Sequence, residues 1–126
     1  MDTNVLVRHL TGDPPAQARR ATALLAGRHT LILTDLVLAE LVYVLESFYE
    51  RPRSDIARVS RSLLGLPSIV AADDLLLLRS LELYEEHRIG FADAYLAAGA
   101  EVSGVGAVAS FDRRLDRIVS IKRREP

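Results

Sequence analysis

Apolar residues recur at helical spacing through most of the chain, and short apolar runs separate these stretches. This pattern predicts six helices, at Asn4–Leu10, Pro15–Ala26, Thr34 or Asp35 to about Tyr49, Ser54–Leu64, Asp73 or Asp74 to Leu83 or Tyr84, and Phe91–Glu101. Thr34 or Asp35 is expected to cap the third helix, and Ser54 the fourth, because short polar side chains bond free amides at helix starts.

The runs between the helices are short and rich in residues that favour strands. Strands are predicted at Thr30–Leu33, Ser68–Ala71 and Gly106–Ser110, with a last edge strand at Ile118–Lys122. Strands that alternate with helices indicate an α/β fold whose parallel sheet is covered on both faces. In such sheets, sites lie at the carboxyl ends of the strands. No repeat or flexible linker is evident, so we expect one domain over residues 1–126.

Composition agrees with a globular domain and removes several kinds of chemistry. Of the 126 residues, 49% are hydrophobic and 26% are charged. The chain has no cysteine, which excludes disulfides, zinc–thiolate sites, iron–sulfur clusters and cysteine nucleophiles. Asp2 and Arg8 interrupt the first apolar stretch, so no signal peptide is predicted, and no apolar run is long enough to span a bilayer. A cytoplasmic location is expected.

The net charge of −1 does not by itself indicate a nucleic-acid partner. However, every basic residue except Lys122 is arginine, whose planar fork suits phosphate oxygens. An arginine-biased genome would explain the same count. If four carboxylates were withdrawn into a metal site, the remaining charge would be +3, which would suit a phosphodiester substrate.

Four acidic residues stand in unusually apolar surroundings. Glu40 and Asp93 are the only charges within Leu36–Leu45 and Gly90–Ala100, Asp112 follows the run Val105–Phe111, and Asp2 precedes Val5–Val7. A carboxylate in an apolar setting is costly without a cation, and carboxylates that gather repel one another unless a metal or shared protons compensate. These acids are therefore candidate metal ligands.

Each of these acids also has a purely structural explanation. Glu40 can point to solvent or pair with an arginine, and Asp112 can serve only as a helix cap. If the acids do form a site, oxygen ligands without cysteine favour Mg²⁺ or Mn²⁺ over zinc or copper. The three histidines show no ligand spacing, and no phosphate-binding glycine loop or nucleophile elbow is present. Ser110 is interpreted as polar support for Asp112.

Four segments resemble a known family. Asp2–Val7, Thr34–Leu45, Gly90–Ala97 and Ala109–Arg113 are similar, in order and spacing, to the four acidic blocks of the PIN-domain ribonucleases. The similarity is greatest to the VapC-type toxins of bacterial type II toxin–antitoxin pairs. It extends over nearly the whole chain.

The resemblance implies a three-layer α/β/α domain with a short, mainly parallel central sheet. It also implies a Mg²⁺- or Mn²⁺-dependent endoribonuclease that hydrolyses RNA with a metal-activated water, forms a homodimer and is neutralised by a VapB-like antitoxin. The residues carried over are Asp2, Glu40, Asp93 and Asp112 as catalytic metal ligands, Asn4 and Ser110 as hydrogen-bonding residues around them, and Asp116 as a further metal ligand.

One departure and three alternatives accompany this interpretation. Only Met1 precedes the first block, where the family has a strand, so we hypothesise a truncated first strand. An aspartyl-phosphate phosphatase would need a second aspartate where Asn4 stands. A phosphoacceptor receiver domain would need a lysine near the pocket, and Lys122 lies in the charged tail. A PIN-like module that binds RNA or protein without cleaving remains the principal alternative.

Overall fold

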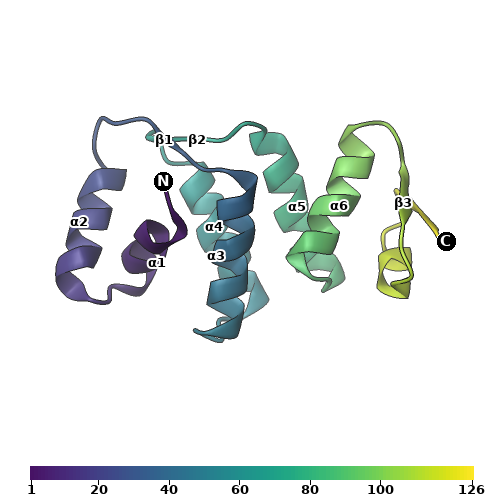
Figure 1. Ribbon diagram of the computed structural model, residues 1–126, viewed down its shortest axis with the longest axis horizontal. Helices are drawn as coiled ribbons and strands as arrows, with labels where there is room; N and C mark the ends of the chain where they lie inside the picture. Colours follow the sequence, from purple (N-terminus) through teal and green to yellow (C-terminus); the bar gives the residue numbers. More distant parts are fainter. The chain divides into compact units, whose positions relative to one another are not determined.

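The helical pattern of the sequence is realised along the whole chain. The computed structural model describes residues 1–126, which fall into two units, Met1–Asp74 and Leu75–Pro126 (Figure 1). The first unit contains α1 (Thr3–Thr11), α2 (Pro15–Leu25), β1 (Leu31–Ile32), α3 (Asp35–Ser47), α4 (Arg53–Leu64) and β2 (Ile69–Val70). The second contains α5, which begins at the boundary (Asp74–His87), α6 (Phe91–Val102), β3 (Ala107–Ala109), the 3₁₀ helix η1 (Arg113–Arg117) and β4 (Lys122–Arg124).

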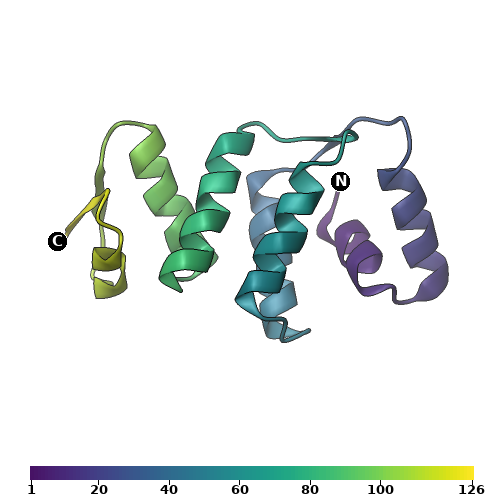
Figure 2. The ribbon, with the colours of Figure 1, turned by 180° about the vertical axis from the view of Figure 1, so that it is seen from behind.

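In the first unit, α1 packs against both α2 and α3, and α3 packs against α4 (Figures 1 and 2). The helices meet through side chains that are fully excluded from water, among them Leu6, Leu38, Leu41 and Ile56. Burial of each such side chain contributes about 1.5–3 kcal/mol to the free energy of folding. The parallel pair β1–β2 aligns Leu31 with Ile69.

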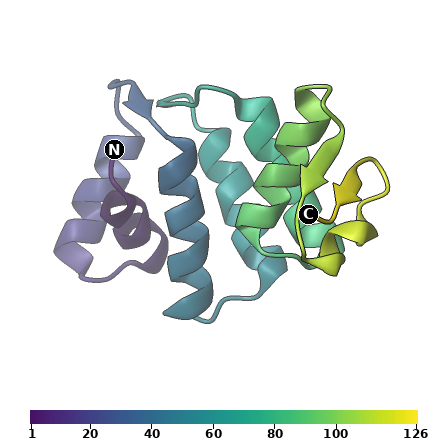
Figure 3. The same cartoon turned by 45° about the vertical axis from the view of Figure 1, so that its right-hand side comes forward.

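In the second unit, β3 and β4 form another parallel pair, and α6 packs against β3 (Figure 3). Val108 of β3 aligns with Arg123 of β4. A two-pronged ion pair joins α5 to α6, since Arg79 Nε and Nη2 donate to the Glu101 carboxylate at 2.7 and 2.9 Å. The ring of Tyr84 meets that of Phe91 edge to face, with centroids 6.2 Å apart.

Helix ends follow local chemistry. The Thr34 hydroxyl accepts from the Val37 amide at 3.2 Å and caps α3. At the end of α1, Gly12 takes a φ of +73°, which side chains disfavour, and its amide donates to the Arg8 carbonyl at 2.9 Å. No helix of the chain combines the length and apolar character needed to cross a membrane.

The predicted α/β class with short parallel strands is confirmed, and all six helices are found. Four details were wrong. The α5 helix continues to His87 rather than ending at Leu83 or Tyr84. The α3 helix ends at Ser47 rather than near Tyr49. Ser54 does not cap α4, because Pro52 occupies the N-cap position and its fixed φ suits a helix start.

The last strand was also misplaced. Ile118 and Ile121 are buried, which produced the apolar signal, but the hydrogen-bonded strand is Lys122–Arg124. Backbone pairing with β3 therefore falls on three basic residues that carry no hydrophobic pattern. The two isoleucines fill the core from the turn before the strand.

The two candidate caps provide a direct test of the fold. Replacing Thr34 by alanine removes the side-chain acceptor of α3 and should lower the free energy of unfolding by about 1 kcal/mol. Ser54→Ala should leave it unchanged, because the exposed Ser54 lies inside α4 and caps nothing. Urea unfolding followed by circular dichroism measures both, and an equal loss in the two variants would contradict the assignment of caps.

Candidate functional site

The start of α1 connects the first acidic block to Glu40 of α3. Asp2 is the N-cap of α1, and its Oδ1 accepts from the Val5 amide at 3.2 Å. The next residue, Thr3, is buried and donates from its hydroxyl to Glu40 Oε2 on α3, at 2.7 Å. A single hydrogen bond thus connects the block around Asp2 to Glu40, and Glu40 Oε1 stays available.

The environment of Glu40 differs from the apolar setting that its neighbours in sequence suggest. On α3, Leu38, Leu41 and Leu45 turn inward and are fully buried. Glu40 lies on the opposite, exposed side of the helix. The unusual feature of α3 is that apolar side chains share this side with Glu40, since Leu36 is 78% and Tyr43 62% exposed. Glu40 therefore needs no buried counter-ion.

Asp93 lies in the first turn of α6, half-buried. Its side chain folds back over the helix start: a methyl group added at Gly90 would stand 3.9 Å from Asp93 Oδ2. The positive end of the helix dipole favours a carboxylate there. Asp93 also lines a groove of about 590 Å³ whose other walls are mainly apolar, including Leu96 and Val108. The sequence prediction of an acid among apolar residues holds at this position.

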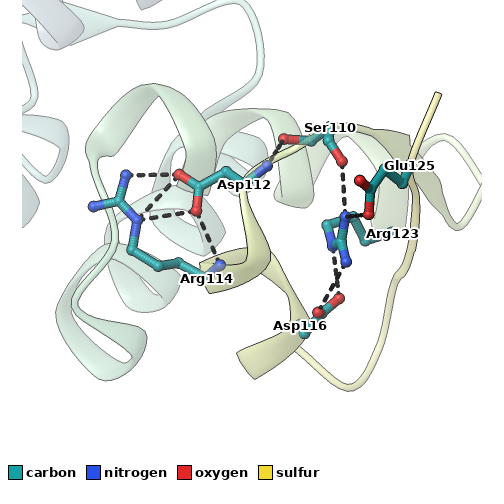
Figure 4. A network of polar contacts seen from close by, with 6 residues as sticks. All are labelled: Ser110, Asp112, Arg114, Asp116, Arg123 and Glu125. Carbon is teal, nitrogen blue, oxygen red and sulfur yellow. Dashed lines mark hydrogen bonds and ion pairs between the residues drawn. The ribbon is translucent and has the colours of Figure 1, made fainter.

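Asp112 caps the short helix η1 and is held by several donors (Figure 4). Its Oδ1 accepts from the Arg114 amide at 2.9 Å, and the Arg114 guanidinium grips both oxygens, with Nη2 at 2.6 Å from Oδ2. The Asp112 amide donates to Ser110 Oγ at 3.0 Å, so Ser110 does support this residue. These bonds from Arg114 lower the pKa of Asp112 to about 2.

Asp116 faces a different partner from Asp112. Its carboxylate accepts from Arg123 of β4, whose Nε lies 2.9 Å from Oδ1, and Arg123 also donates to the Ser110 carbonyl at 3.0 Å (Figure 4). This contact attaches η1 to β4. The proposed metal role of Asp116 stays a prediction, and the structure gives this residue an ion pair of its own.

The donor set is suited to a hard cation. All the candidate ligands are carboxylates, which Mg²⁺ and Mn²⁺ prefer. In the second unit the cationic side chain of Arg114 already interacts with Asp112 and Asp93. Its guanidinium binds Asp112, which raises the pKa of Arg114, and the charge of Asp93 adds to this effect. Within each unit, however, no three Asp, Glu or His side chains gather closely enough to hold a metal.

Sequence reasoning missed the role of Thr3 and the pairing of Arg114. A signal for Thr3 was present, because Thr3, Leu6 and Val7 follow helical spacing and all three are buried. That spacing directs the threonine hydroxyl inward. The pairing of Arg114 had no signal, because Arg113, Arg114 and Arg117 look alike in sequence. Asn4 is exposed and lines a groove with Asp2, with no hydrogen bond to it.

The Arg114–Asp112 contact makes a pH-dependent prediction. In Arg114→Ala, the pKa of Asp112 should rise from about 2 towards its ordinary value of 3.8. A lowered pKa in the folded state means that the pair stabilises the fold above about pH 4 and that this contribution is lost as the pH falls towards 2. Carbon-13 NMR titration of the aspartate carboxyl measures the pKa. Arg113→Ala is the control, because Arg113 lies one residue away and outside the contact, and it should leave the pKa of Asp112 unchanged. A pKa shift in Arg113→Ala but not in Arg114→Ala would contradict the assignment.

Comparison with known proteins identifies the family of the chain. A search of curated proteins gave no match. The model of the PIN domain matches residues 1–120, which include all the candidate acids. This supports the three-layer α/β/α architecture that the sequence predicts. The chain therefore belongs to the PIN domain family, whose members are commonly nucleases.

Proposed function

We propose that the protein is a Mg²⁺- or Mn²⁺-dependent endoribonuclease and that Asp2, Glu40, Asp93 and Asp112 hold the metal ion. The observation that carries the proposal is the family match over residues 1–120 in a chain that retains an acid in each of the four blocks. Hydrogen bonds in the first unit, and a hydrogen bond together with a charge interaction in the second, support it. Asp2 and Glu40 are connected through Thr3, and Asp112 and Asp93 both act on one cationic side chain.

The reaction is hydrolysis of an RNA phosphodiester bond. Water oxygen bonds to phosphorus, the bond from phosphorus to the leaving ribose oxygen breaks, and that oxygen takes up a proton. A bound divalent ion would polarise the phosphoryl oxygen and lower the pKa of the water. The chain orients its own carboxylates for this: Thr3 fixes Glu40 Oε2, and Ser110 fixes the backbone of Asp112. We also propose Asn4 as a residue that hydrogen-bonds to the metal ligands and Asp116 as a further ligand of the metal.

The VapC-type assignment adds partners to this proposal. A cytoplasmic toxin of this type would act as a homodimer and be neutralised by a VapB-like antitoxin. Exposed apolar side chains suit such contacts, since Leu36 and Tyr43 flank Glu40 on the exposed side of α3. Burial of these side chains against a partner would be favourable. A module that binds RNA without cleavage is the competing function.

Asp93→Asn tests the nuclease assignment. Loss of one ligand charge should reduce Mn²⁺-dependent cleavage of RNA by at least about a hundredfold while the thermal unfolding curve stays close to that of the parent. Glu86→Gln is the matched control, because it removes an exposed carboxylate of α5 whose side chain lies 3.9 Å from that of its neighbour His87. Equal cleavage by the parent and Asp93→Asn would refute the site. RNA binding without cleavage by the parent would establish the competing function.

The toxin assignment has a separate test in cells. Expression of the parent chain alone should arrest growth, because cleavage of cellular RNA stops protein synthesis. Expression of Asp93→Asn to the same level should not, and Glu86→Gln should behave as the parent. Colony counts and protein levels from an inducible promoter measure this. If cells grow normally while they contain abundant folded parent protein that cleaves RNA, the protein is a nuclease and the toxin assignment is wrong.

A further inference from the structure

A polar groove lies between α1 and α2, wholly inside the first unit. It has a volume of about 560 Å³. Its walls are Asp2, Asn4, Val5 and Arg8 from the start of α1, and Gln17, Arg20, Ala21 and Leu24 from α2. The four residues of α2 follow the spacing i, i+3, i+4, i+7, so a single face of that helix forms one wall. The groove begins at Asp2, the proposed metal ligand.

Two arginines in this groove have no carboxylate partner. Arg8 Nε donates to the neutral Gln17 side chain at 2.9 Å, which holds the guanidinium across the groove. Arg20 is exposed and forms no ion pair. By contrast, Arg51 and Arg58 of the same unit both bind Asp55. Guanidinium groups that are not neutralised by the protein are available to bind an anion.

We propose that this groove binds the sugar–phosphate backbone of RNA, with Arg8 and Arg20 contacting phosphates next to the proposed cleavage site. This inference rests on the proposed function and names the surface that carries its substrate. Phosphate contacts position a nucleic acid without reading its bases. Arg8 and Arg20 are therefore positioning residues, which hold the strand while the carboxylates act.

The remaining walls favour RNA over an acidic peptide. Asn4 and Gln17 have side-chain amides that both donate and accept hydrogen bonds, as a ribose hydroxyl also does. Val5 and Leu24 are partly exposed and offer an apolar floor for a ribose or base. An acidic peptide has neither ribose hydroxyls nor bases to place against these amides and this apolar floor.

Binding is measured without cleavage, by fluorescence anisotropy of a labelled single-stranded RNA in EDTA at several salt concentrations. Arg20→Ala should weaken binding about three- to tenfold and lower the slope of log affinity against log salt by about 0.7. Arg8→Ala should act similarly. Arg20→Lys should retain the slope, because the charge stays. Arg58→Ala is the matched control: it removes an exposed arginine already paired with Asp55, and affinity should not change.

The outcomes separate this inference from the proposed function. If the parent cleaves RNA but both alanine variants bind it with parental affinity and slope, the groove proposal is overturned and the nuclease remains. If the parent binds RNA through Arg8 and Arg20 but never cleaves it with Mn²⁺, the groove stands and the nuclease fails. If the alanine variants bind RNA normally but escape neutralisation by a co-expressed antitoxin, the groove is a protein-binding surface and the proposal is wrong.

Discussion

Hydrogen-bond donors and positive charge stabilise an ionised carboxylate, and three of the four candidate acids of this chain meet them at a helix start. Asp2 and Asp112 accept backbone amides as helix caps, and Asp93 lies at the positive end of α6. Glu40 takes the hydroxyl of Thr3. Helix starts therefore orient Asp2, Asp93 and Asp112 before any ligand binds, whereas Glu40 depends on the side chain of Thr3.

The parts of the fold that the sequence predicts are those whose side chains carry a pattern. Amphipathic stretches identified every helix, and the cap of α3 was narrowed to Thr34 or Asp35, of which the structure selects Thr34. Pro52 and β4 were not recognised. Proline starts α4 through its fixed φ, without a side-chain bond. The backbone of Lys122–Arg124 pairs with β3 although its side chains carry no strand pattern.

The candidate site was visible to a different degree at each position. An isolated charge in an apolar stretch predicted apolar surroundings for Asp93, which the structure shows, and burial for Glu40, which it does not. Sequence spacing cannot tell which side of α3 faces the core when both sides are apolar. The contact between Thr3 and Glu40 joins residues 37 positions apart, and only tertiary structure reveals such a bond.

The guanidinium of Arg114 on Asp112 has a consequence for ion selectivity. Any ion that binds this carboxylate competes with a positive charge that is already attached to the chain. A monovalent ion such as K⁺ brings no more charge than the group it would displace, so exchange offers little electrostatic gain. A divalent ion brings twice that charge. If Asp112 holds the metal as proposed, Arg114 would have to give way to the ion, and this exchange would favour a divalent over a monovalent ion.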